Sequence, residues 1–153
     1  MIGQKTCVRE TGSTKVKGFT LVEILTVVVI VGILLAVGIP NYQQYVIKSK
    51  RSAAKGCLLE YSSWMERFYT TNLRYDKTAA GAAISFPVLS CAGAGDTGKF
   101  YTYAFDGTPT KSGYKLKASP QGAQLADSKC GTLTLEHNGT KGASGSDGAA
   151  GCW

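Results

Sequence analysis

The sequence predicts an α+β fold, in which one long N-terminal helix packs on a small antiparallel sheet and a C-terminal loop follows. Three observations support this prediction. An apolar run begins at residue 19 and continues with helical periodicity to about residue 71. Three short segments of alternating polarity lie between residues 100 and 136. A tail rich in Gly, Ala and Ser then runs from Asn138 to Gly151, bracketed by Cys130 and Cys152.

The apolar run follows a short, polar, basic leader and starts abruptly at Phe19. It extends to Ile39, which makes 21 residues, enough to span a bilayer as a helix. One carboxylate, Glu23, lies inside the run, where a charge is costly and usually functional. Pro40 ends the run and predicts a kink, because proline removes a backbone hydrogen bond.

Beyond Pro40 the helix is predicted to be amphipathic. Its apolar residues recur at helical spacing as Ala54, Cys57, Leu58, Tyr61, Met65 and Phe68. Such a stripe must be covered, and the rest of the chain is the available partner.

The segment of about residues 72–98 is predicted to be a loop over the head of the molecule. Its glycines at 93–98 match the dinucleotide-binding pattern, which needs a strand before it and a helix after it. Here a strand-like segment follows and no helix does, so we expect no nucleotide site. Strands are predicted at 100–105, 114–118 and 132–136, close enough in sequence to form an antiparallel meander.

Five cysteines are present, and Cys7 lies in the leader. The other four indicate disulfides in an exported head, with three possible connectivities that the sequence alone does not distinguish. No Cys-x-x-Cys spacing occurs, and the single His137 does not complete a zinc site. We therefore expect neither a metal nor a cofactor.

The chain has a formal charge of +7, to which the leader contributes +3, since it has four basic residues and one acidic residue. Four lysines lie on or beside the predicted sheet and are candidates for contact with DNA phosphates: Lys111, Lys115, Lys117 and Lys129. Lysines on a solvent-exposed face of a sheet usually only keep the protein soluble. We expect that simpler role, with DNA contact as the alternative.

The N-terminal motif resembles that of the type IV pilin family, type IVa. The residues that match are Gly18, Phe19, Glu23, Pro40, Tyr42 and Tyr45. The C-terminal region, with Cys130–Leu135 and the final Cys152-Trp153, is most similar to PilE-class minor pilins of Gram-negative bacteria. The resemblance implies that prepilin peptidase cuts between Gly18 and Phe19 and methylates Phe19. It also implies that Glu23 neutralises the N-terminal amine of a neighbouring subunit.

The resemblance further implies three regions: a cleaved leader at 1–18, a transmembrane and filament-core helix at 19–40, and a head at 41–153 that includes the amphipathic half of the helix. The protein would reside in the inner membrane and then in an extracellular pilus. Among the three connectivities we expect Cys130–Cys152, which would close the C-terminal loop, and then Cys57–Cys91 by elimination.

The function predicted is that of a structural subunit, a minor pilin that supports pilus biogenesis, adhesion or twitching motility. Its partners would be other pilin subunits, the inner membrane and prepilin peptidase. The alternatives are a DNA-binding pilin for natural transformation and a pseudopilin of a type II secretion system. No nucleophile-elbow, metalloprotease or phosphate-loop motif occurs, so we expect no enzymatic activity.

Overall fold

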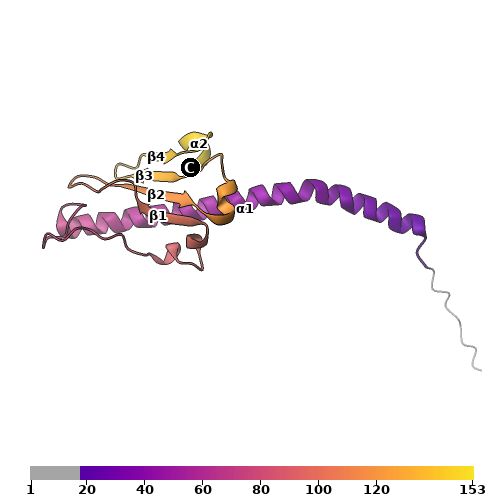
Figure 1. The fold of residues 1–153 in the computed structure, drawn as a ribbon, viewed down its shortest axis with the longest axis horizontal. Coiled ribbons are helices and arrows are strands. Elements are labelled where there is room, and N and C mark those ends of the chain that lie inside the picture. The colour runs from indigo at the N-terminus through magenta and orange to yellow at the C-terminus, as the bar shows by residue number, and fades with distance from the viewer. Residues whose placement is uncertain (1–17) are drawn as a thin grey trace, which may run out of the picture. The chain divides into compact units, whose positions relative to one another are not determined.

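A computed structural model describes residues 18–153 (Figure 1). Except for Gly18, the predicted leader lies outside the described residues, and so does Cys7. The chain divides into two compact units that meet in sequence between Pro40 and Asn41. The described elements, in chain order, are α1 (Leu21–Asn72), the 3₁₀ turns η1 (Ser90–Ala92) and η2 (Thr97–Lys99), β1 (Tyr101–Phe105), β2 (Lys115–Pro120), the 3₁₀ turn η3 (Gly122–Ala126), β3 (Leu133–Glu136), β4 (Lys141–Ala143) and α2 (Gly148–Cys152).

Helix α1 confirms the long N-terminal helix predicted from the apolar run and the stripe. It begins one residue after Thr20, whose Oγ1 accepts a hydrogen bond from the Glu23 backbone N–H (3.2 Å). Its N-terminal part is apolar and exposed, and by length and composition the helix could cross a membrane. The helix runs through Pro40 without interruption and ends at Asn72, whose Nδ2 donates to the Phe68 carbonyl (2.9 Å).

The head, residues 41–153, contains one four-stranded antiparallel sheet in the order β1-β2-β3-β4. The sequence predicted only three strands, so β4 is a correction. Periodicity could not reveal it, because β4 is three residues long with glycine in its centre. That glycine, Gly142, lies opposite Thr134, and a Cβ at Gly142 would overlap the Thr134 hydroxyl.

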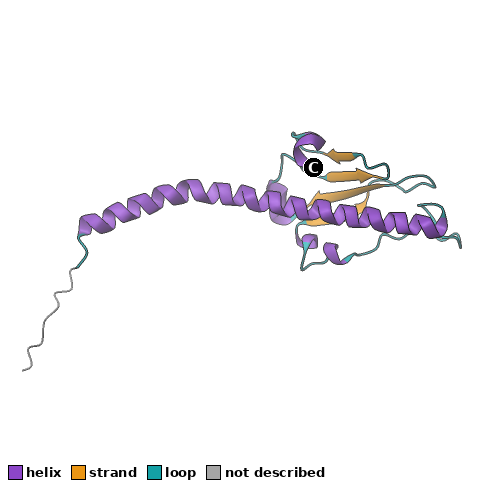
Figure 2. Cartoon of the chain, turned by 180° about the vertical axis from the view of Figure 1, so that it is seen from behind, coloured by secondary structure: helices purple, strands orange, loops and turns teal. Residues whose placement is uncertain are grey.

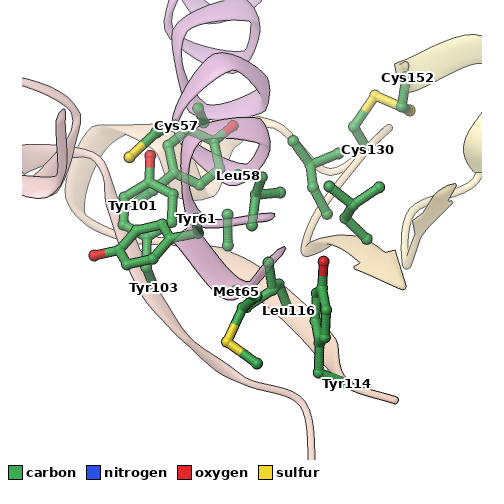
Figure 3. Close-up of a cluster of buried hydrophobic side chains, with 14 of the residues drawn as sticks. Cys57, Leu58, Tyr61, Met65, Tyr101, Tyr103, Tyr114, Leu116, Cys130 and Cys152 are labelled. Atoms are coloured by element: carbon green, nitrogen blue, oxygen red, sulfur yellow. A yellow bond between two sulfur atoms is a disulfide. The ribbon is translucent and has the colours of Figure 1, made fainter. Parts of the chain in front are cut away.

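The core lies between α1 and one face of the sheet, as the views from opposite sides show (Figures 1 and 2). The buried helix residues are Ala54, Cys57, Leu58, Tyr61 and Met65. They pack against the inward residues of the first three strands, which are Tyr101, Tyr103, Leu116, Ala118, Leu133 and Leu135 (Figure 3). Alternation along each strand turns these six side chains toward the helix and the residues between them outward.

The glycine-rich tail is attached to the rest of the head at several points. The disulfide Cys130–Cys152 closes it, as expected. The Trp153 indole donates to the Gly142 carbonyl (2.8 Å), and the Gly145 N–H donates to the Cys130 carbonyl (3.0 Å). These bonds attach the tail to β4 and to the chain before β3.

The segment between α1 and β1 is held to the helix stripe by a second disulfide, Cys57–Cys91. The ring of Phe86 stacks on Tyr61 with a centroid separation of 4.6 Å, and the Tyr61 hydroxyl donates to the Pro87 carbonyl (3.1 Å). The long connection thus covers one side of the core.

A buried polar cluster attaches η3 to the helix. Arg51 makes a bidentate pair with Asp127 (2.6 and 2.8 Å), whose side chain is 2% exposed. Gln124, which is fully buried, donates from Nε2 to the Ile47 carbonyl (3.1 Å) and lies 3.0 Å from the Tyr101 hydroxyl. Both oxygens of the Asp127 carboxylate accept a hydrogen bond from the Arg51 guanidinium. Loss of either residue would leave the other as an unpaired buried charge.

Four core tyrosines predict a loss of stability in alkaline solution. Burial, as the largest cause, raises the pKa of Tyr75, Tyr101, Tyr103 and Tyr114 to about 12. A raised pKa means that the folded state holds the proton more firmly than the unfolded state, whose tyrosines titrate near 10. Stability should therefore be complete below pH 10 and fall as the pH rises from about 10 toward 12, by up to about 1.4 kcal/mol per pH unit for each tyrosine.

The test is chemical denaturation of the full chain in detergent micelles between pH 8 and 11, with tyrosinate absorbance as a second signal. Tyr103→Phe should make the decline with pH shallower. An unfolding midpoint that stays constant to pH 11 would contradict the link between these buried hydroxyls and stability.

Candidate functional site

The N-terminal residues that the sequence singled out lie at the start of α1. Gly18 and Phe19 precede the helix, and Phe19 is exposed. Thr20 occupies the N-cap and Glu23 the third helical position, which is the spacing of a capping box. A carboxylate there also interacts favourably with the positive end of the helix dipole. Glu23 thus lies at the third position of a capping-box sequence, in which the Thr20 hydroxyl accepts a hydrogen bond from the Glu23 backbone N–H.

Two of the four candidate lysines are neighbours on the outward face of β2. Lys115 Nζ lies 3.5 Å from Asp106 Oδ2 and 3.6 Å from Glu136 Oε1, and Lys117 Nζ lies 3.5 Å from Asp106 Oδ1. Two carboxylates therefore face two ammonium groups. The sheet face is close to neutral at this point, which weakens any attraction for phosphate.

The other two candidates lie at opposite ends of the head. Lys129 lies beside the first turns of the head's helix, where it lines a hollow of about 460 Å³ with Lys48 and Arg51. Lys111 lies in the turn between β1 and β2, and its carbonyl accepts a hydrogen bond from the Tyr75 N–H (3.4 Å). Because α1 rises 1.5 Å per residue, the 21 residues from Arg51 to Asn72 separate these ends by roughly 30 Å. The four lysines do not form one surface.

Lys111 instead joins basic residues that were not selected from the sequence. The C-terminal end of α1, the loop after it and the β1–β2 turn lie at the same end of the head (Figures 1 and 2). We call this the helix-end surface and define it by Arg67, Arg74, Lys77 and Lys111. Arg74 forms a bidentate pair with Asp76 (2.6 and 2.9 Å). Arg67, Lys77 and Lys111 are exposed, and within residues 18–153 none of them forms an ion pair.

An aromatic cluster packs the loop of the helix-end surface against α1 and the residue before β2. Tyr75 stacks on Tyr69 (4.6 Å between centroids) and meets Tyr114 edge-on (4.9 Å). The hydroxyls of Tyr75 and Tyr114 each donate to the Glu66 carboxylate at 3.0 Å. The pKa of both tyrosines is raised by burial first and then by the neighbouring carboxylate. The loop that carries Arg74 and Lys77 is thereby fixed on α1.

The glycine pattern at 93–98 has a structural explanation. A Cβ at Gly98 would overlap the Ala92 carbonyl, so this close turn requires glycine. The pattern ends within the short turn η2 and is followed by β1, rather than by the helix that a phosphate site needs. Within residues 18–153 no group of three His, Cys, Asp or Glu side chains is placed to hold a metal ion.

Comparison with known proteins gives two family matches. The model of the prokaryotic N-terminal methylation motif matches residues 13–39. The model described as type IV minor pilin ComP, DNA uptake sequence receptor, matches residues 40–134, which is more than half of the chain.

Two curated relatives and two solved structures are similar. The chain is 35% identical over 106 residues to the type IV major fimbrial protein FimA of Dichelobacter nodosus (60% of this chain, 65% of the relative). It is 32% identical over 121 residues to the type IV major alpha-pilin of Moraxella bovis (77% of this chain, 66% of the relative), so it spans just under two thirds of each relative.

A type IV pilin from Shewanella oneidensis aligns with a TM-score of 0.46 and 27% identity (70% of this chain, 97% of that one). The non-core minor pilin PilV of Neisseria meningitidis aligns with a TM-score of 0.45 and 21% identity (66% and 89%).

The methylation-motif match covers the apolar start of a helix that could span a membrane, and the ComP-type match extends over that helix's amphipathic half, β1, β2 and the start of β3. This chain therefore belongs to the type IV pilin family.

Proposed function

We propose that this pilin is a minor subunit that binds DNA during uptake, through the helix-end surface. The observation that carries the proposal is the match of residues 40–134 to the model of a DNA uptake sequence receptor. The role is one of assembly and binding rather than catalysis. From the sequence alone a purely structural role ranked first, and the family match reverses that order.

Processing and assembly follow the N-terminal motif. We propose cleavage between Gly18 and Phe19 by prepilin peptidase, methylation of Phe19, and residence in the inner membrane of a Gram-negative bacterium before incorporation into a pilus. In this scheme residues 1–18 are the leader, 19–40 the membrane and filament segment, and 41–153 the head. Pro40 and the glycines before it would let the helix kink between the last two.

Glu23 has two candidate roles that predict different results. If Glu23 pairs with the N-terminal amine of a neighbouring subunit, its negative charge is essential, because an unpaired charge in a dry filament core is severely penalised. If it only caps the helix behind Thr20, a neutral side chain that still accepts hydrogen bonds suffices.

We expect Glu23→Gln to abolish incorporation into sheared pili as completely as Glu23→Ala, while cleavage and the fold of the head stay normal. The matched control is Thr20→Ala, which removes the cap but keeps the charge and should retain most incorporation. Normal incorporation of Glu23→Gln together with failure of Thr20→Ala would show that Glu23 acts by capping and would reject the charge pair.

The helix-end surface favours DNA over the outward face of β2 for an electrostatic reason. Phosphate attraction is strongest for cations that are not held in ion pairs, and within residues 18–153 Arg67, Lys77 and Lys111 form none. Lys115 and Lys117 share Asp106 and Glu136. The hollow beside Lys129 also contains Asp147, and it lies where α1 enters the head from the apolar segment.

The test compares duplex binding by the full chain in detergent micelles across a salt series. Replacing Arg67, Lys77 and Lys111 together with Gln should weaken binding at physiological salt at least tenfold. The slope of log K against log salt should fall by about 0.9 for each phosphate that the variant no longer neutralises. The matched control removes the same charge elsewhere, by replacing Lys48, Lys55 and Lys129 with Gln, and should change both quantities much less.

Two results would contradict the proposal at different points. No measurable duplex binding by the unaltered chain at physiological salt would reject the DNA-binding function. Equal reductions in affinity in the two triple variants would keep DNA binding but reject the helix-end surface as its location.

A further inference from the structure

Leu73 combines two unfavourable properties at the end of α1. Its φ of 54° makes it the one non-glycine residue among 18–153 with a left-handed backbone conformation. That conformation brings Cβ close to the following carbonyl, so glycine or asparagine normally occupies it. The Leu73 side chain is also 70% exposed, so burial in the head does not compensate for the strain.

The surrounding hydrogen bonds hold Leu73 in this conformation. Its N–H donates to the Tyr69 carbonyl (2.7 Å), which is the single bond of a left-handed helix cap. Asn72 fixes the residue before it, since its Nδ2 donates to Phe68 and its Oδ1 accepts from the Ala79 N–H (2.8 Å). Tyr75, two residues after Leu73, is buried and stacked on Tyr69. The exposed, apolar side chain of Leu73 is thus held in a fixed position.

The charges near Leu73 indicate what such a side chain could meet. It directly precedes Arg74 and belongs to the same end of the head as Arg67, Lys77 and Lys111. A ligand that fits must offer an apolar contact flanked by negative charge. Duplex DNA has this pattern, with base pairs between two rows of phosphates, and DNA-bending proteins press leucine and similar side chains against base steps in this way.

We infer that Leu73 is an apolar wedge that packs against a base step of duplex DNA, while the cations of the helix-end surface contact the phosphates on either side. This inference rests on the proposed DNA-binding function and adds a contact to the bases. Strained backbone is often found where a side chain must be held ready for a ligand, which agrees with the fixed position of Leu73.

The experiment uses the full chain in detergent micelles and a 30-base-pair duplex with 2-aminopurine in place of adenine at TA steps. Leu73→Asn should be at least as stable as the parent chain, because asparagine tolerates the left-handed conformation. It should weaken binding about tenfold or more, leave the salt slope unchanged because every phosphate remains neutralised, and abolish the fluorescence rise that reports unstacking. The matched control is Val88→Asn, at an 85% exposed valine outside the helix-end surface, and it should change none of these.

Three outcomes would overturn the inference. If the parent chain does not bind the duplex, both the proposed function and the wedge fail. If the parent binds and its affinity falls in the Arg67, Lys77 and Lys111 variant, but Leu73→Asn binds equally well with the same fluorescence, only the wedge fails. If Leu73→Asn binds DNA normally and instead fails to incorporate into pili, Leu73 contacts a neighbouring pilin.

Discussion

The burial of one stripe of helix α1 beneath the sheet is the interaction on which the rest of the head depends. The first three strands contribute six buried side chains to the face toward the helix, and a sheet must bury such a face against a second layer. Leu58, Tyr61 and Met65 supply the other half of the core from the helix. The disulfide Cys57–Cys91 then attaches the long connection before the sheet to the helix, and Cys130–Cys152 closes the segment that contains β3, β4 and α2. Cross-links of this kind compensate for the limited core of a small domain.

The packing of the helix on the sheet also determines which basic side chains can attract phosphate. Alternate side chains of the first three strands face the helix. Since Leu116 and Ala118 of β2 face it, Lys115 and Lys117 point outward, and the register places Lys115 opposite Glu136. The lysines that looked most like a DNA-binding face are therefore compensated by carboxylates. Where the helix stops, the following loop and the β1–β2 turn meet at Tyr75 and Lys111. The exposed cations there form no ion pair within the part of the chain that the structure describes. The helix end, rather than the sheet, has the stronger electrostatic case for binding phosphate.

The sequence was sufficient for the long helix, the first three strands and the disulfide that closes the tail, because periodicity and cysteine positions are local signals. It was insufficient for β4, since Lys141, Gly142 and Ala143 show no alternation and pair only because β3 lies beside them. The helix-end surface was missed for a related reason. Arg67 and Lys111 are 44 residues apart in the chain, and only the docking of the sheet on the helix brings their segments to one end. The strain at Leu73 has no sequence signal at all.

Binding of DNA at the end of the head where α1 stops is the central claim about this pilin. Amide hydrogen exchange of the full chain in detergent micelles, with and without duplex DNA, tests this claim most directly. We predict added protection in residues 67–78 and 107–113, and none in residues 41–51 or around Lys129. Protection confined to residues 41–51 and the segment around Lys129, with the helix end unchanged, would contradict the claim.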